Sequence, residues 1–195
     1  MPVTLLPPTG MNEKEEDSFS MIVPVFENTG AQNATLYIGN QVTANDAALL
    51  LQENITSTMN VAVNVYLAPL QLANGTHIRR TQVGLIDGHG NSLTHLLAAV
   101  FALDGILNQE SPGKAHYPAH KYGNVLVHCR GGRSRSLVVL AVYLFWRHRD
   151  QFPNIETAIS HIRDLRQIED NYPLPGMIKL AEEASQFLGV QFRAS

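Results

Sequence analysis

The segment NVLVHCRGGRSRSLVVLAVYLFWRHR, residues 124–149, constrains the fold more than any other part of the chain. The five residues NVLVH contain a short apolar run that stops at His128, which is typical of a fully buried strand. The seven residues after Cys129 comprise two glycines, three arginines and two serines. A longer apolar run then ends on basic residues, which favours a helix because cations stabilise the C-terminal end of a helix. We therefore predict a strand, a polar loop and a helix around the only cysteine of the 195 residues.

Strands alternate with helices along the first part of the chain, and helices dominate its end. We predict strands at 35–40, 59–67 and 77–87, a turn at 74–76, and helices at 43–55, 91–107, 154–166 and 174–188. The first of these helices has Thr43 or Asn45 available as its N-cap. This order predicts an α/β fold, with a central, mostly parallel sheet flanked by helices.

Residues 1–34 are rich in proline and acidic side chains, and we interpret them as an N-terminal tail or arm. Within this arm, residues 18–26 have the apolar character of an edge strand, since Pro24 argues against a central position. We expect residues 35–195 to form a single domain.

The bulk properties exclude several classes of protein. A net charge of −3 implies no general affinity for nucleic acid. One cysteine forms no internal disulfide, and the N-terminus lacks the pattern of a signal peptide. The apolar stretches are too short or too interrupted to span a bilayer. We therefore expect no transmembrane segment and a location in the cytosol or nucleus; the oligomeric state stays open.

The loop after Cys129 has the composition of an anion-binding cradle. Gly131 and Gly132 permit a tight turn whose backbone N–H groups point inward, and the following helix N-terminus adds partial positive charge. A thiol in such a place has a lowered pKa. Arg135 begins the helix, and its planar guanidinium suits two phosphate oxygens. The pattern indicates a nucleophile and an anion clamp for in-line attack on a phosphoryl group.

Other interpretations of these residues exist. Cys129 alone is compatible with an inert core cysteine, although the loop is too polar for an apolar pocket. Arg130 and Arg133 are not required by phosphate binding itself. One interpretation is that they form a basic rim that prefers polyanionic substrates, which Arg79 and Arg80 would extend. The other is that they are ordinary charged side chains exposed to solvent.

The loop resembles the His-Cys-x5-Arg-Ser/Thr signature of the cysteine-dependent protein tyrosine phosphatases, here spanning His128 to Ser136. The stretch LYIGN near residue 36 and the segment LRQIEDN, with Asn171 at the asparagine position, extend the resemblance to the dual-specificity subgroup over residues 36–188. The resemblance implies that Cys129 forms a phosphocysteine intermediate, that Ser136 assists the thiolate and that His128 supports the loop. It also implies substrate binding by the loop, through Arg130, Gly131, Gly132, Arg133, Ser134 and Arg135.

Catalysis of this kind needs an acid that protonates the leaving oxygen. Asp87 lies at the end of a predicted strand, on a glycine-rich loop before a helix, and matches the position of the subgroup's general acid. Its alternative role is to cap the helix that starts near Ser92. Asn91 is a candidate to hold this loop, and Asp104, inside a helical pattern, is a weaker candidate for the acid. The interval from Asp87 to Cys129 is longer than in the family, and the loop 111–123 absorbs the excess.

The resemblance implies a metal-independent enzyme without a cofactor that acts on phosphorylated proteins. The sole tryptophan, Trp146, lies in a predicted helix, so the Trp-Pro-Asp loop of the larger tyrosine-specific enzymes is absent. A shallower pocket, open to phosphoserine and phosphothreonine, is implied. The alternatives are a phosphatase for phosphoinositides or other non-protein substrates, and a non-catalytic phospho-binding module. The pair His116 and His120 has metal-like spacing, but Pro118 favours a loop there.

Overall fold

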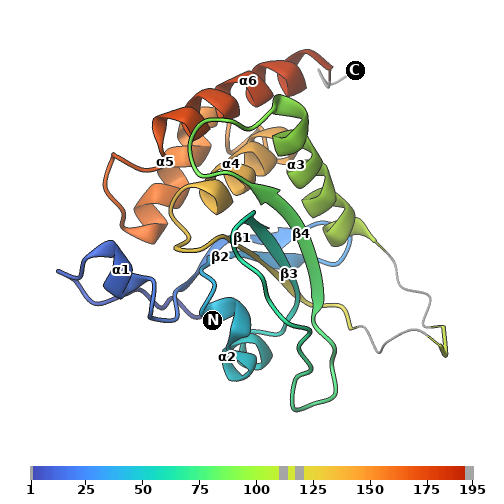
Figure 1. Cartoon of the computed structure of the whole chain (residues 1–195). Coiled ribbons are helices and arrows are strands. Elements are labelled where there is room, and N and C mark those ends of the chain that lie inside the picture. Colours follow the sequence, from blue (N-terminus) through green and yellow to red (C-terminus); the bar gives the residue numbers. More distant parts are fainter. Residues whose placement is uncertain (1, 110–113, 117–120, 192–195) are drawn as a thin grey trace.

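The computed structural model describes residues 2–109, 114–116 and 121–191. One sheet has the strand order β1-β2-β5-β3-β4, and helices pack on both of its faces (Figure 1). The strands are β1 (Ile22–Thr29), β2 (Ala34–Gly39), β3 (Ile55–Ala62), β4 (Arg79–Leu85) and β5 (Asn124–His128). The helices are α1 (Glu13–Glu16), the 3-10 turn η1 (Thr43–Asn45), α2 (Ala47–Gln52), α3 (Leu93–Asn108), α4 (Arg135–Arg147), α5 (Ile155–Arg166) and α6 (Pro175–Gln191).

The strands β2, β5, β3 and β4 run parallel, and β1 pairs antiparallel with β2. The strand β5 is central, with β2 on one side and β3 on the other. Residues 125–128 of β5 are buried, as a parallel strand covered on both faces requires. The predicted α/β fold with a central, mostly parallel sheet is therefore confirmed.

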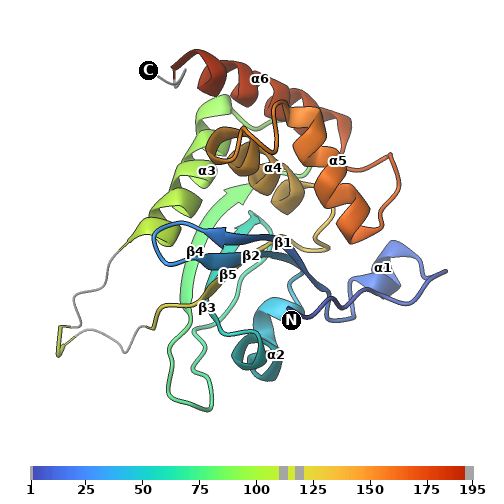
Figure 2. The same ribbon diagram turned by 180° about the vertical axis from the view of Figure 1, so that it is seen from behind.

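The larger apolar core lies between the sheet and α3, α4, α5 and α6, which share one face (Figures 1 and 2). The helix α4 is buried along residues 135–145, and its apolar residues contact both the sheet and the surrounding helices. A smaller apolar cluster on the opposite face includes Leu50 of α2, Tyr37 of β2 and Leu126 of β5. Burial on both faces fixes the direction in which β5 and α4 hold the loop between them.

Part of the predicted arm belongs to the sheet. The strand β1 forms its edge, as expected for residues 18–26, and Pro24 is tolerated because an edge strand leaves some N–H positions unpaired. The hydroxyl of Thr29 lies 3.1 Å from that of Tyr143 in α4 and 2.9 Å from Nε2 of His148. Residues before β1 run along the surface, where Leu5 bridges to Ile22. The stretch 1–34 therefore contributes both a surface arm and a strand.

Three local predictions differ from the structure: the hairpin at 74–76, the extent of the strand at 59–67 and the N-cap of the helix predicted at 43–55. The turn at 74–76 closes only a bridge between Gln71 and His77, and the following β4 pairs in parallel with β3 rather than forming a hairpin. The strand predicted at 59–67 ends at Ala62, because the Asn60 side chain bonds to the backbone of Ala62 and Val65 and turns the chain.

The N-cap of α2 is Asp46, which accepts a hydrogen bond from the N–H of Leu49 at 3.0 Å.

The predicted loop 111–123 falls partly outside the described residues. Across the described ranges, no helix is both long enough and apolar enough to cross a membrane.

The contact between β1 and α4 makes a testable contribution to stability. Replacing Tyr143 with Phe removes a buried hydroxyl that bonds to Thr29, so the free energy of unfolding should fall by about 1 kcal/mol in urea titrations. Tyr66→Phe is the matched control, because Tyr66 is 82% exposed, and its unfolding should match that of the unmodified chain. Equal stability of both variants would contradict a structural role for this contact.

Candidate active site

The candidate site lies at the edge of the sheet where the parallel strands end. Cys129 follows β5, Asn64 follows β3 and Asp87 follows β4. The carboxyl ends of parallel strands meet at one edge of a sheet, and ligand sites form there. These three residues line a pocket of about 540 Å³ together with the loop after Cys129.

Gly132 shapes the loop around the sulfur. Its N–H donates a hydrogen bond to Sγ of Cys129 at 3.3 Å, and its φ of +68° lies in the left-handed region. A Cβ atom at this position would lie 2.7 Å from the carbonyl oxygen of Gly39 and 2.2 Å from the Met21 side chain. A side chain here would therefore be strained and would collide with β2, so the turn requires glycine.

Cys129 is buried, yet its surroundings lower the pKa of its thiol. Its side chain is 2% exposed, and Oγ of Ser136 lies 3.4 Å from Sγ. Burial raises the pKa of the thiol, but the charge of Arg135 and hydrogen bonds from Ser136 and Gly132 outweigh burial and lower it overall. The loop therefore stabilises the charged, nucleophilic form of this buried sulfur.

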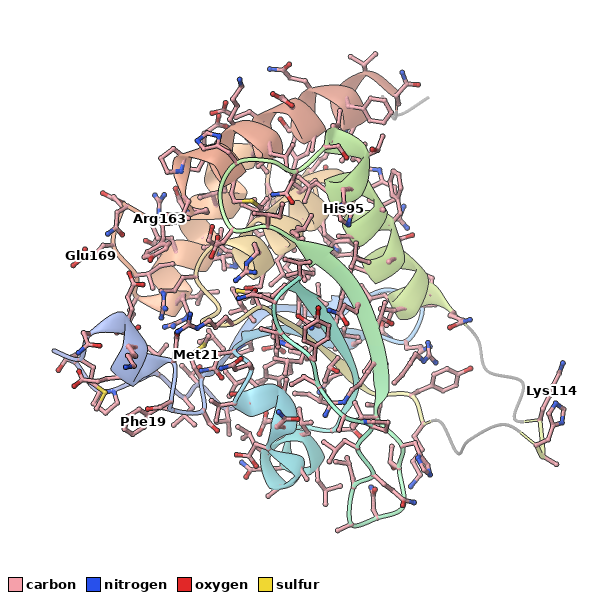
Figure 3. The ribbon with its side chains drawn as sticks, viewed as in Figure 1. Phe19, Met21, His95, Lys114, Arg163 and Glu169 are labelled. Atoms are coloured by element: carbon pink, nitrogen blue, oxygen red, sulfur yellow. The ribbon has the colours of Figure 1, made fainter. Side chains whose placement is uncertain are left out.

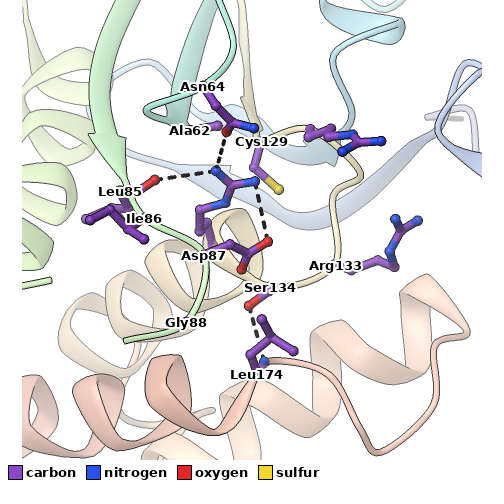
Figure 4. Close-up of polar contacts among 12 residues, drawn as sticks. Ala62, Asn64, Leu85, Ile86, Asp87, Gly88, Cys129, Arg133, Ser134 and Leu174 are labelled. Carbon is purple, nitrogen blue, oxygen red and sulfur yellow. Dashed lines mark hydrogen bonds and ion pairs between the residues drawn. The ribbon is translucent and has the colours of Figure 1, made fainter. Parts of the chain in front are cut away.

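Arg135 is held by the ends of two strands. One terminal nitrogen donates to Oδ1 of Asn64 at 2.8 Å and to the carbonyl of Leu85 at 3.4 Å. The other lies 3.4 Å from the carboxylate of Asp87 (Figure 4). Nε of Arg135 is buried and has no hydrogen-bond partner among the described residues. The guanidinium is thus fixed in the pocket with a donor left for an anion.

Asp87 lies on the pocket wall, and 41% of its side chain is exposed. As predicted, Asn91 holds this loop: it accepts from the N–H of Ile86 at 2.8 Å and donates to the carbonyls of Ile86 and Gly88. The N-cap of α3 is Ser92, so Asp87 does not cap that helix. Asp87 therefore lies on the wall of the pocket that contains Cys129 and Arg135.

The weaker acid candidate, Asp104, is used elsewhere. It lies in α3, pairs with Arg147 at 3.1 Å and is not among the pocket-lining residues.

His128 and Ser134 support the loop from within. His128 is fully buried, with Nδ1 3.2 Å from the carbonyl oxygen of Cys129. Burial lowers the pKa of His128 to about 4, so the imidazole is neutral at physiological pH. Ser134 accepts a hydrogen bond from the N–H of Leu174 at 3.2 Å, which ties the loop to the start of α6. Both side chains contact the backbone around the loop.

Arg166 is a supporting residue that the sequence analysis missed. It ends α5, is 3% exposed, and donates to the carbonyl of Gly131 at 3.4 Å. Burial lowers its pKa to about 10, so it remains a cation beneath the loop at neutral pH. The stretch LRQIEDN contains Arg166, but only the packing of α5 places this side chain under the loop.

The two additional loop arginines are paired with the N-terminal arm. Nε of Arg130 lies 3.0 Å from Asp17, and Arg133 contacts Asp17 at 2.7 Å and Glu16 at 3.0 Å. Arg133 is 8% exposed, so the interpretation as solvated charge is wrong for this residue. The arm reaches β1 through Met21, which is labelled beside Phe19 in Figure 3.

Arg79 and Arg80 do not extend this rim. They begin β4, at the opposite end of the strand from Asp87, and neither lines the pocket.

Comparison with known proteins identifies relatives of this site and fold. A family model described as dual specificity phosphatase, catalytic domain, matches residues 36–184. Dual specificity protein phosphatase 26 of Mus musculus is 31% identical over 137 residues, which cover 70% of this chain and 58% of that protein. The chain thus spans less than two thirds of the length of this relative.

Two solved structures share the fold. Human DUSP28 superposes with a TM-score of 0.62 at 21% identity, covering 95% of this chain and 99% of that one. PTPMT1 in complex with PI(5)P superposes with a TM-score of 0.56 at 22% identity, covering 81% and 94%. The family match includes the loop that holds Cys129 and Arg135. The chain therefore belongs to the dual-specificity phosphatases, within the cysteine-dependent protein tyrosine phosphatase superfamily.

Proposed function

We propose that the chain hydrolyses phosphotyrosine and phosphoserine or phosphothreonine in proteins through a phosphocysteine intermediate. One observation carries the proposal: a buried cysteine with a lowered pKa, a fixed arginine with a spare donor, and a carboxyl group line the same pocket. Family membership supports the same chemistry.

Substrate binding uses the loop and Arg135. The N–H groups of residues 130–134, the N-terminus of α4 and the guanidinium surround one phosphoryl group and neutralise its charge. Sγ of Cys129 attacks phosphorus as the bond to the ester oxygen breaks. Asp87 gives its proton to that oxygen, so an alcohol leaves and phosphocysteine remains.

Hydrolysis of the intermediate reverses the role of Asp87. The carboxylate takes a proton from water while the water oxygen attacks phosphorus and the S–P bond breaks. Inorganic phosphate and the thiolate are released, and the hydroxyl of Ser136 donates a hydrogen bond to the departing sulfur.

The same scaffold allows other phosphoryl substrates, as the PTPMT1 structure with its phosphoinositide illustrates. Such a preference would use the additional loop arginines as a basic rim. Here Arg130 and Arg133 are already paired with carboxylates, which supports a protein substrate. A non-catalytic phospho-binding role would leave the nucleophile and Asp87 unused.

The nucleophile is tested by Cys129→Ser, which should lower the turnover of an aryl phosphate by roughly 10⁴-fold or more. Phosphate should still bind, because Arg135 and the loop remain, and calorimetry measures that binding. Arg135→Lys is the contrasting variant, expected to lose phosphate affinity as well as turnover. Normal turnover by Cys129→Ser would rule out the phosphocysteine mechanism.

Ser136→Ala tests how the thiolate is stabilised. Loss of the Ser136 hydroxyl removes a hydrogen bond that lowers the pKa of Cys129, so the rate of alkylation by iodoacetamide should rise at a higher pH than in the unmodified chain. Ser134→Ala is the matched control, because its hydroxyl bonds to Leu174 instead, and its profile should not move. If the alkylation rates of all three proteins depend on pH in the same way, Ser136 does not lower the pKa of Cys129.

Asp87→Asn tests the general acid. The rate should fall about 10²- to 10⁴-fold for esters with poor leaving groups and far less for an activated aryl ester that needs no proton. Asp104→Asn makes the same charge change outside the pocket and should leave both rates unaltered. If Asp87→Asn hydrolyses poor leaving groups as fast as the unmodified chain, another group supplies the proton.

A further inference from the structure

We propose that Asp17 is a specificity-determining residue that restricts the pocket to substrates with a single phosphoryl group at the reacting site. With Glu13 and Glu16 it forms an acidic cap, by which we mean these three carboxylates. The cap occupies two loop arginines that would otherwise bind a second anionic group. This inference rests on the proposed phosphatase function and names its substrate class.

Asp17 makes the central contacts of the acidic cap. It is 8% exposed, and its two oxygens engage different arginines, Nε of Arg130 at 3.0 Å and a terminal nitrogen of Arg133 at 2.7 Å. It also packs directly on the loop, since a Cβ atom at Gly131 would lie 2.5 Å from Oδ1. The carboxylate is therefore built into the outer surface of the cradle.

Arg133 is enclosed by carboxylates. Besides Asp17 it contacts Glu16 at 3.0 Å and Glu13 at 3.7 Å. Burial lowers the pKa of Arg133, but the three carboxylates outweigh burial and raise it overall. Its positive charge is thus compensated within the protein, and a substrate anion would have to compete with Asp17 for it.

The pairing of charges around the pocket favours a substrate with one phosphoryl group, which Arg135 and the loop bind. Three carboxylates of the acidic cap face two guanidinium groups, and Glu13 and Asp17 themselves line the pocket. Lys14, exposed on α1, is a further cation of the lining, and Arg135 serves the reacting phosphoryl group. A second phosphate beside the first would find Arg130 and Arg133 already paired and would have to displace Asp17 from them, which disfavours that substrate.

The acidic cap is held in place by its own contacts. Asn12 caps α1 with a reciprocal hydrogen-bond pair to Glu15, and the hydroxyl of Tyr172 donates to Glu13. The chain then continues through Met21 into β1, and α1 lies beside the loop in both views (Figures 1 and 2). These contacts fix the carboxylates at one side of the pocket.

The test compares two peptides that differ only in a second phosphoryl group next to the reacting one. The unmodified chain should have the higher kcat/KM for the singly phosphorylated peptide. Asp17→Asn should raise the ratio of kcat/KM for the double to the single peptide by about tenfold, since it releases Arg130 and Arg133. A loss of kcat/KM that affects both peptides equally cancels in this ratio. Glu183→Gln, an equal charge change at an exposed position of α6, should leave the ratio unaltered.

A second pair of variants identifies the groups that are released. Arg130→Gln should change the ratio little in the unmodified chain, where Asp17 occupies Arg130, but should reduce the gain produced by Asp17→Asn. If Asp17→Asn does not fold, the double variant Glu13→Gln with Glu16→Gln should shift the ratio in the same direction by a smaller factor. An unchanged ratio in folded variants, or a preference of the unmodified chain for the double peptide, would overturn the proposal.

Binding separates this inference from the proposed activity. In a Cys129→Ser background, the Kd values of the two peptides report the same preference without turnover. A chain that hydrolyses neither peptide refutes the proposed function, whereas the Kd ratio with and without Asp17→Asn still decides the role of Asp17.

Discussion

The buried sulfur of Cys129, whose charged form needs stabilisation, is the constraint on which this structure depends. Removing a sulfur anion from water is unfavourable unless donors and positive charge surround it. Ser136, the N–H of Gly132 and the charge of Arg135 meet this need at Cys129. Their convergence requires a rigid strand on one side and a rigid helix on the other, and both β5 and α4 are accordingly enclosed in the core.

Contacts from other parts of the chain hold Arg135 and the loop after Cys129 in position. Arg135 is fixed by Asn64 after β3, by Leu85 at the end of β4 and by Asp87 after β4, so two neighbouring strands set its position. The loop backbone is held from beneath by Arg166 and from outside by Asp17. Residues distant in sequence therefore hold the phosphate cradle, and each acts through the preorganisation on which electrostatic catalysis depends.

The features that the sequence allowed us to predict follow from local pattern, although the hairpin at 74–76 and the extent of the strand at 59–67 were wrong. The strand, the loop and the helix around Cys129, the fold class and the places of Asp87 and Asn91 each rest on periodicity, glycine spacing or a short motif. Asn64 and Arg166 were not identified, because each reaches the site across the sheet or through helix packing. The partners of Arg130 and Arg133 were also missed, since they lie more than one hundred residues earlier in the chain and no periodic pattern links them.

The pairing of β1 with β2 bears on where the catalytic unit begins. The family model starts at residue 36, beyond both α1 and β1. A fragment cut at that boundary would expose the edge of β2 to pairing with other chains. It would also leave Arg130 and Arg133 without their carboxylates, so its rim would attract anions that the intact surface disfavours. Substrate profiles measured on such a fragment would describe a different electrostatic surface from that of this chain.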